Sequence, residues 1–265
     1  MAHIAVQEAQ KGTAHAVLAA KSCLGEISGS VLVLFGDTPL ICKDTLQNTV
    51  KRLEASPQNG VVVLALENAS HPHYGRLVLR HNQEVARIVE MKDASENERT
   101  LPLCNSGVMA IQGAHLWQFL EQIQSTNKAG EYYLTEIARK EGMTVVWEKV
   151  AEGEVMGVNT RADLAQAEEL LQQKLRAAAM EKGVTFLDPK SVYLCEDTCF
   201  EQDVTVYPHV YFGPQVSVGQ GVDIYSFSHI EGARIDAGAS IGPFARIRPQ
   251  THIHENAKVG NFVEL

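Results

Sequence analysis

Short apolar runs alternate with amphipathic segments over the first part of the chain, up to about residue 158. Apolar runs at 30–35 and 60–66 have the length of buried strands, and the segment 43–55 between them carries apolar side chains at helical spacing. Continuous apolar runs are typical of parallel strands that are covered on both faces. This order predicts an α/β domain with a parallel sheet and right-handed crossovers.

The same patterning predicts further elements in this region. Apolar and alternating segments favour strands at 2–7, 77–79, 85–89, 103–111 and 144–150. Amphipathic segments favour helices after Thr13, at 114–125 and from 131–137.

A long helical pattern follows, from about Arg161 to Lys182, and Gly183 supplies a C-terminal cap. We therefore expect a linker helix over residues 159–183. Its apolar stripe is predicted to consist of Leu164, Ala167, Leu170, Leu171, Leu175 and Ala178.

From residue 184 to 265 the helical spacing stops and a period of six begins. The main apolar series, with a single five-residue step, is Val206, Phe212, Val218, Ile224, Ile230, Ile235, Ile241, Ile247, Ile253 and Val259. A series of smaller residues stands two places before it, at Val204, Val210, Val216, Val222, Ala233, Ala239, Ala245, Thr251, Ala257 and Val263. The pattern predicts a parallel β-helix, whose core is buried only by stacking of coils. Because the period is still running at Leu265 and an open coil edge is a pairing hazard, we expect the chain to be cut short or its end to be covered.

One polar side chain stands where ligands bind in open α/β sheets. Asp37 follows the apolar run 30–35 and Gly36, just past the expected carboxyl end of a strand. A carboxylate there suits Mg²⁺, which takes oxygen ligands and also contacts substrate phosphates. The alternative is that Asp37 only caps the following helix, and these residues alone do not decide between the two.

Composition narrows the classes of function. The chain has a formal net charge of −9 with 45% hydrophobic and 21% charged residues, as in ordinary globular proteins. An acidic balance argues against non-specific binding to nucleic acid or to a membrane surface. No apolar run approaches the roughly 18 residues of a membrane span. Five scattered cysteines lack a zinc-site pattern and favour reduced thiols in a cytoplasmic protein.

One further group of residues has chemistry suited to a planar base. Gln7 and the Gly12-Thr13 helix start could present amide and backbone groups to it, although an ordinary strand-to-helix turn is the simpler interpretation of these residues alone. Glu90, taken alone, is interpreted as a surface carboxylate beside Lys92.

The order of these motifs is similar to that of one bacterial enzyme family over essentially the whole chain. The matching motifs are Gln7 with Gly12-Thr13, Phe35 to Leu40, Tyr74-Gly75-Arg76, Glu90 to Ala94, Asn105-Ser106-Gly107, Gly130 to Thr135, Gly157-Val158-Asn159 and Ile241 to Pro249. The chain resembles the bifunctional N-acetylglucosamine-1-phosphate uridylyltransferase / glucosamine-1-phosphate acetyltransferases. This resemblance implies a Rossmann-like nucleotidyltransferase domain over residues 1–158, the arm helix 159–183, and a partial left-handed β-helix of hexapeptide repeats over 184–265.

The resemblance also implies roles for individual residues. Gln7, Gly12 and Thr13 would bind uracil. The N-acetylglucosamine group would be bound by Gly75, Glu90, Asn105 and Thr135. Asp37 and Asn159 would bind Mg²⁺. The full set of substrate-binding positions is Gln7, Gly12, Thr13, Gly36, Gly75, Glu90, Asn105, Thr135 and Asn159. Arg248 matches a basic residue of the acetyltransferase site.

The expected reaction is Mg²⁺-dependent transfer of a uridylyl group from UTP to N-acetylglucosamine-1-phosphate. A homotrimer is expected through the β-helix if that β-helix is complete. The family's Gly-rich triphosphate loop and first strand have no counterpart after Met1, and the later coils are absent after Leu265. We therefore expect impaired uridylyl transfer and no acetyl transfer from this chain. The alternatives are a non-catalytic protein that binds UDP-sugars or serves assembly, and a sugar nucleotidyltransferase for another base or sugar.

Overall fold

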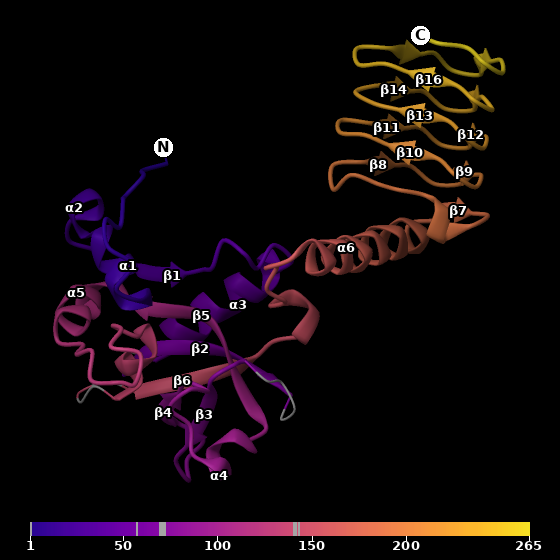
Figure 1. Cartoon of the computed structure of the whole chain (residues 1–265). Coiled ribbons are helices and arrows are strands. Elements are labelled where there is room, and N and C mark those ends of the chain that lie inside the picture. The colour runs from indigo at the N-terminus through magenta and orange to yellow at the C-terminus, as the bar shows by residue number, and fades with distance from the viewer. Residues whose placement is uncertain (1, 57, 69–72, 140–141, 143) are drawn as a thin grey trace. The chain divides into compact units, whose positions relative to one another are not determined.

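The computed structural model describes residues 2–56, 58–68, 73–139, 142 and 144–265. The chain divides into two compact units, Met1–Thr160 and Arg161–Leu265. Figure 1 shows an α/β unit formed by the first part and a coiled solenoid preceded by a long helix in the second. In the described part of the chain, no helix is long and apolar enough to cross a membrane.

The first unit is built on a six-stranded mixed sheet in which β5 is central. β5 pairs antiparallel with β2 on one side and with β1 and β3 on the other, and β2 and β6 are parallel neighbours. The strands are β1 Ser30–Val33, β2 Asn59–Glu67, β3 Arg76–Leu79, β4 Val85–Val89, β5 Leu103–Gln112 and β6 Thr144–Lys149.

Helices cover both faces of this sheet because successive residues of β2 point to opposite sides. Val61 and Val63 pack in one core with Leu116 of α5, and Val62 packs in another with Leu53 of α3. The helices of the unit are α1 Thr13–Ala19, α2 Lys21–Leu24, α3 Lys43–Glu54, α4 Glu96–Arg99, α5 Gly113–Glu121 and the 3₁₀ turns η1 Leu134–Arg139 and η2 Glu152–Glu154.

The α/β fold class is confirmed, but the expectation of a purely parallel sheet is wrong. β1 and β2 run in the same direction, as their connection through α3 requires, yet the antiparallel β5 lies between them. Apolar patterning shows that a strand is buried and does not show which later strand is inserted beside it. The expected strand at 2–7 is also absent, and Ile4 and Val6 are 88% and 75% exposed.

The second unit is a solenoid of two-residue strands stacked into three parallel sheets, consistent with a left-handed β-helix. Equivalent residues on neighbouring coils are twenty apart between β7 and β9, as in Thr185↔Thr205. Further along they are eighteen apart, as in Tyr211↔His229, or seventeen where the five-residue step falls, as in Ser217↔Arg234. The strands are β7 Thr185–Phe186, β8 Cys199–Phe200, β9 Thr205–Val206, β10 Tyr211–Phe212, β11 Ser217–Val218, β12 Asp223–Ile224, β13 His229–Ile230, β14 Arg234–Ile235, β15 Ser240–Ile241, β16 Arg246–Ile247, β17 His252–Ile253 and β18 Lys258–Val259.

The main apolar series forms the core of the solenoid, as predicted. Every member from Val206 to Ile253 is buried, and Val259 is half-buried. The gap in the small-residue series is filled by Ser228, which is 2% exposed. Its hydroxyl donates to the carbonyl of Tyr225 over 2.8 Å, so a buried polar group is satisfied inside the coil.

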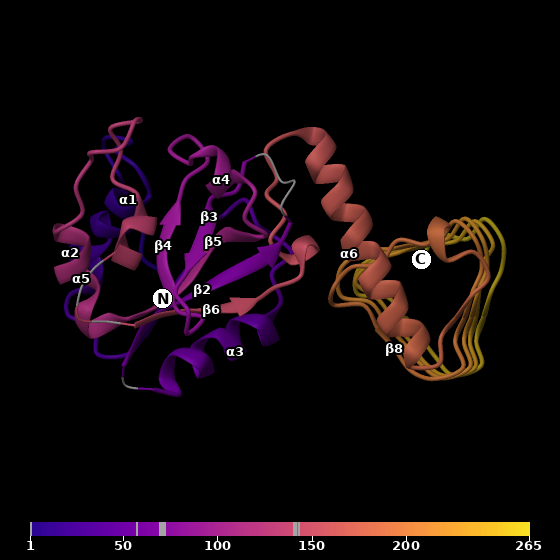
Figure 2. The same cartoon turned by 90° about the horizontal axis from the view of Figure 1, so that it is seen from below.

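Helix α6, Arg161–Glu181, clusters with the solenoid and lies against its first coil, as Figure 2 shows. Its buried face contains Ala167, Gln172, Arg176 and Ala179, whereas Leu164 of the predicted stripe is 46% exposed. The two polar residues, Gln172 and Arg176, form hydrogen bonds with backbone groups at the open edge of the first coil. The Gln172 amide donates to the carbonyl of Leu194 over 2.7 Å and accepts from its N–H over 2.9 Å, and Arg176 donates to the carbonyl of Val192 over 3.0 Å. Polar side chains are buried here because the first coil has backbone groups that no preceding coil satisfies.

Replacing Gln172 with leucine is expected to destabilise the solenoid by about 2–3 kcal/mol, because both backbone groups of Leu194 lose their partner. Hydrogen exchange at the Leu194 amide measures the effect locally. Gln173→Leu is the matched control, since its side chain is exposed and bonds only Glu169 within the helix. Unchanged protection of Leu194 in Gln172→Leu would contradict this role.

Candidate functional site

Asp37 lies in the turn that leaves β1. Thr38 closes this turn, since its N–H and hydroxyl donate to the carbonyl of Phe35 over 3.3 and 2.9 Å. Helix α3 begins only at Lys43, and its N-cap residue is Cys42. Asp37 is therefore not the cap of that helix, and its exposed carboxylate is available for another role.

Asp37 meets Asn159 across Gly157. The N–H of Val158 donates to the Asp37 carbonyl over 2.8 Å and so joins the two segments. A methyl group built on Gly157 would lie 3.7 Å from Asp37 Oδ2 and 3.6 Å from Asn159 Nδ2, so both side chains border the space above this glycine. Neighbouring carboxylate and amide groups with open space between them fit a hard cation such as Mg²⁺, once the Asn159 amide turns its oxygen inward.

Gly107 of β5 packs against Phe35, which follows the end of β1. The ring of Phe35 lies directly over Gly107, where an added Cβ would come within 1.9 Å of Phe35 Cε2. Gly107 also has φ +87°, a conformation that L side chains rarely adopt, and its N–H donates to Asn105 Oδ1 over 3.1 Å. The Phe35 and Asn105 segments are therefore held together by a position that only glycine can occupy.

Gly107→Ala is expected to lower the free energy of unfolding of this unit by more than about 2 kcal/mol, through the clash and the positive φ. Both tryptophans, Trp117 and Trp147, lie in this unit, so their fluorescence during urea unfolding reports on it. Gly29→Ala is the control, since a Cβ there has open space. Equal free energies of unfolding for Gly107→Ala and Gly29→Ala would show that position 107 does not require glycine.

The next contacts connect Asn105 to Thr135. The Asn105 N–H donates to the Gly75 carbonyl over 2.8 Å, and a Cβ on Gly75 would lie 3.3 Å from Glu90 Oε2. The Thr135 hydroxyl donates to Glu90 Oε1 over 3.1 Å. Burial raises the pKa of Glu90, and the nearby Asp93, Glu131 and Glu136 carboxylates raise it further, while the Thr135 bond opposes them.

The N-terminal candidates lie beside the segment that leads to Thr135. The Leu134 N–H donates to the Thr13 hydroxyl over 2.9 Å, and a Cβ on Gly12 would approach the Tyr132 carbonyl oxygen to 2.6 Å. Gln7 donates to the Gly12 carbonyl over 3.2 Å and contacts His15 Nδ1 at 2.8 Å. Tyr132 precedes the 3₁₀ turn η1, and the helix expected to begin at Glu131 begins only at Leu134.

The candidate residues thus form one continuous run of contacts in the first unit. From Gln7 it passes through Thr13, Thr135, Glu90, Gly75 and Asn105 to Gly107, Phe35, Asp37 and Asn159. Gly36 lies within this run, in the turn between Phe35 and Asp37, with open space around its Cα. Residues from seven separate segments are brought together, as a shared ligand site requires.

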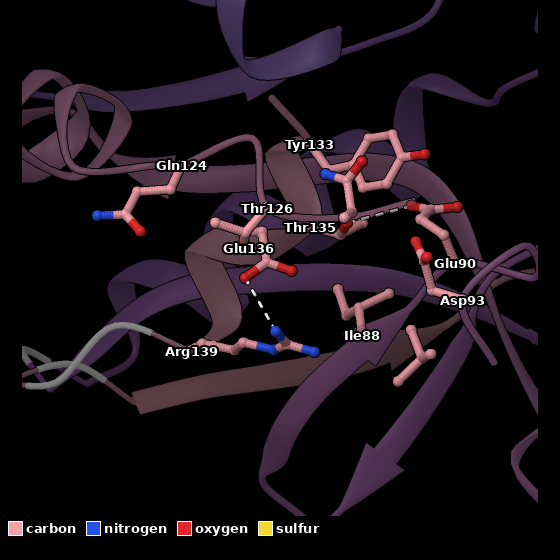
Figure 3. A pocket seen from close by; sticks show the side chains of 11 residues that line it. Ile88, Glu90, Asp93, Gln124, Thr126, Tyr133, Thr135, Glu136 and Arg139 are labelled. Atoms are coloured by element: carbon pink, nitrogen blue, oxygen red, sulfur yellow. Dashed lines mark hydrogen bonds and ion pairs between the residues drawn. The ribbon is translucent and has the colours of Figure 1, made fainter. Parts of the chain in front are cut away.

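A pocket of about 180 Å³ opens beside part of this run (Figure 3). Of the candidates, Glu90 and Thr135 line it, together with Asp93, Tyr133 and Glu136. Arg139 brings a cation, but its guanidinium pairs with Glu136 at 3.2 Å. The pocket is therefore acidic and rich in acceptors, which suits a polyhydroxylated ligand better than a bare phosphate.

Sequence patterning missed two residues that position the site. Arg76 is 1% exposed and donates to the carbonyls of Tyr74 and Arg99, which fixes the turn that holds Gly75. Tyr132 contributes only backbone groups to Gly12 and Ala14, and such contacts leave no side-chain signal. Arg248 lies apart from these residues in the second unit, where its exposed guanidinium pairs with Glu264.

Comparisons with known proteins identify the family of the chain. The family described as Nucleotidyl transferase matches residues 1–172. The "Bifunctional protein GlmU" of Paramagnetospirillum magneticum is 47% identical over 263 residues, which cover 98% of this chain and 58% of that protein. The proteins of the same name from Zymomonas mobilis and Xanthobacter autotrophicus are 45% and 48% identical, over 98% and 94% of this chain and 58% and 55% of theirs.

Among solved structures, a UDP-glucose pyrophosphorylase complexed with UDP-glucose aligns with a TM-score of 0.48 and 17% identity, over 63% of this chain and 64% of that one. The chain spans less than three-fifths of the length of the curated relatives named above. The family match alone covers most of the chain, including every candidate residue of the first unit. This chain is therefore a member of the nucleotidyl transferase family, similar in sequence to the bifunctional GlmU proteins.

Proposed function

We propose that the first unit binds UTP and N-acetylglucosamine-1-phosphate and transfers the uridylyl group to give UDP-N-acetylglucosamine and pyrophosphate. The observation that supports this most strongly is the continuous run of contacts from Gln7 to Asn159. It brings groups suited to a base, a sugar and a metal to one place. The similarity to the bifunctional GlmU proteins points to the same reaction.

Gln7 offers a means of selecting uracil. Its amide nitrogen is held by the Gly12 carbonyl and His15, which orients the amide. An amide oxygen accepts a hydrogen bond from N3–H of uracil, whereas N3 of cytosine is itself an acceptor. Gly12 and Thr13 pack closely against the backbone of Tyr132 and Leu134, which holds this end of the proposed site in place.

Glu90 is the proposed ligand for the sugar hydroxyls. Its two carboxylate oxygens can each accept a hydrogen bond from a sugar hydroxyl, and Thr135 orients the group through Oε1. Gly75 lies close enough to Glu90 that a side chain there would crowd the carboxylate. Because its pKa is raised, Glu90 gains from the hydrogen bonds that a bound sugar supplies.

Asp37 and Asn159 are the proposed magnesium ligands. An acidic chain with a net charge of −9 needs a local cation to hold a triphosphate. Bound there, Mg²⁺ would neutralise charge on the reacting phosphates. The chain's own residues align the sugar phosphate with the α-phosphorus of UTP, and the reaction needs no protein nucleophile.

The second unit is proposed to be part of a glucosamine-1-phosphate acetyltransferase domain, with Arg248 in its site, and a complete β-helix of this type is proposed to form a homotrimer in the cytoplasm. The word "bifunctional" in the relatives' name supports a second activity. The hexapeptide solenoid supports assembly through parallel coils. Sedimentation equilibrium of the whole chain tests the trimer directly.

The proposed reaction is tested by mixing the chain with Mg²⁺, N-acetylglucosamine-1-phosphate and each of UTP, CTP and ATP in turn. Pyrophosphate release reports turnover, and calorimetry with UDP-N-acetylglucosamine reports binding. We expect selective binding of the uridine compound and pyrophosphate release with UTP but not with CTP or ATP. Binding without turnover would favour a UDP-sugar-binding protein, and preference for CTP or ATP would overturn the uridylyl assignment.

A further inference from the structure

Two histidines and an aspartate of the second unit meet on the outer face of the solenoid. Asp236 directly follows β14, His252 begins β17, and His254 follows that strand. The parallel register pairs Arg234 with His252 and Ile235 with Ile253. Because the two isoleucines point into the core, the residues on either side of them point outward and form a square on the surface.

The ligand atoms of the three residues converge. His252 Nε2 lies 2.7 Å and His254 Nδ1 lies 4.0 Å from Asp236 Oδ2. One ligand atom from each residue falls within 4.8 Å of the others. A tetrahedral metal about 2.1 Å from each ligand separates the ligand atoms by roughly 3.4 Å, a value that the two observed distances bracket. Small side-chain rotations would complete the site.

The carboxylate is already oriented for this role. Arg234 Nε lies 2.8 Å from Asp236 Oδ1, so the guanidinium holds that oxygen and leaves Oδ2 facing both histidines. Ligating carboxylates are commonly held by a second group in this way. Asp236 is 23% exposed, whereas the His252 and His254 side chains are 43% and 79% exposed, which leaves them room to rotate.

We propose that Asp236, His252 and His254 bind one divalent transition-metal ion of the Zn²⁺ type, linking the coils of β14 and β17. Imidazole nitrogens favour such ions over Mg²⁺, which prefers oxygen ligands. Three protein ligands on an open surface leave a coordination position for water or another donor. The site is independent of the uridylyl-transfer proposal and uses none of its residues.

The test is calorimetric titration of the full chain with Zn²⁺ in the presence of excess Mg²⁺. Visible absorption with Co²⁺ provides a second readout of the coordination geometry. We expect one site that Mg²⁺ does not displace, and at least tenfold weaker binding in Asp236→Asn, His252→Gln and His254→Gln. Circular dichroism checks that each variant is folded. His229→Gln is the matched control, because His229 lies on the same solenoid 3.7 Å from Glu231 and packs against the ring of Tyr211, outside the three-residue cluster.

Each result decides the assignment. Weakening in all three variants but not in the control supports the three-ligand site. Unchanged affinity in His254→Gln would reduce the cluster to a histidine–aspartate hydrogen bond and overturn the proposal. Equal weakening by His229→Gln, or no Zn²⁺ binding that resists Mg²⁺, would also overturn it.

Discussion

Asp37→Ala is expected to weaken Mg²⁺-dependent binding of UDP-N-acetylglucosamine about 100-fold, because the site loses its only proposed carboxylate ligand for the metal. Asn159 alone offers a neutral amide, which attracts a divalent cation much less strongly than a carboxylate. Calorimetry with and without EDTA measures the effect. In the variant, the affinities with and without metal should become nearly equal.

Asp44→Ala controls for the loss of one negative charge on the same segment. Asp44 is exposed in the first turn of α3, and none of the contacts that join the candidate residues involves it. Its replacement should leave the metal dependence of binding unchanged. If Mg²⁺ strengthened ligand binding by Asp37→Ala as much as by the wild-type protein, Asp37 would not be a magnesium ligand.

Glu90→Gln is expected to weaken UDP-N-acetylglucosamine binding about 100-fold, since two charge-assisted hydrogen bonds to sugar hydroxyls become neutral ones or are lost. UMP, which lacks the sugar, should bind both proteins equally. Glu84→Gln, in the β3–β4 hairpin, is the matched control. Equal loss of UMP and nucleotide-sugar affinity would indicate general disruption and contradict the sugar role.

The same substitution should stabilise the unit at neutral pH. The pKa of Glu90 is raised in the folded state, so its charged form costs stability that glutamine does not. The difference between the two proteins should be absent below the ordinary carboxyl pKa. It should grow as the pH rises through the raised folded value, because the wild-type protein loses stability over that range. Urea unfolding followed by tryptophan fluorescence at several pH values measures it.

The solenoid was predictable from sequence because each rung repeats one local environment. A single five-residue step at Ile230–Ile235 shifts the register, and the structure accommodates it by pairing Ser217 with Arg234. The contacts of α6 were not predictable in the same way. Gln172 and Arg176 look like solvated helix residues, and their burial depends on backbone groups of the coil beneath them.

The candidate site shows the same limit. Its motifs and residue types pointed to a base, a metal and a sugar, and the structure brings those residues into contact. The contacts themselves pass largely through glycines and backbone groups, such as Gly107 under Phe35 and Gly12 against Tyr132. Hydrophobic periodicity carries no information about such contacts. It also gave no sign that β5 lies between β1 and β2, since a strand's pattern encodes its faces and not its neighbours.

The central claim is that base, metal and sugar groups of the first unit act on one ligand. Saturation-transfer NMR with UDP-N-acetylglucosamine and Mg²⁺ tests it most directly, since uracil and sugar protons are resolved separately. We predict transfer to the uracil ring and to the N-acetylglucosamine group in the wild-type protein, with selective loss of the sugar signals in Glu90→Gln. Transfer to neither group, or identical spectra for the two proteins, would contradict this account.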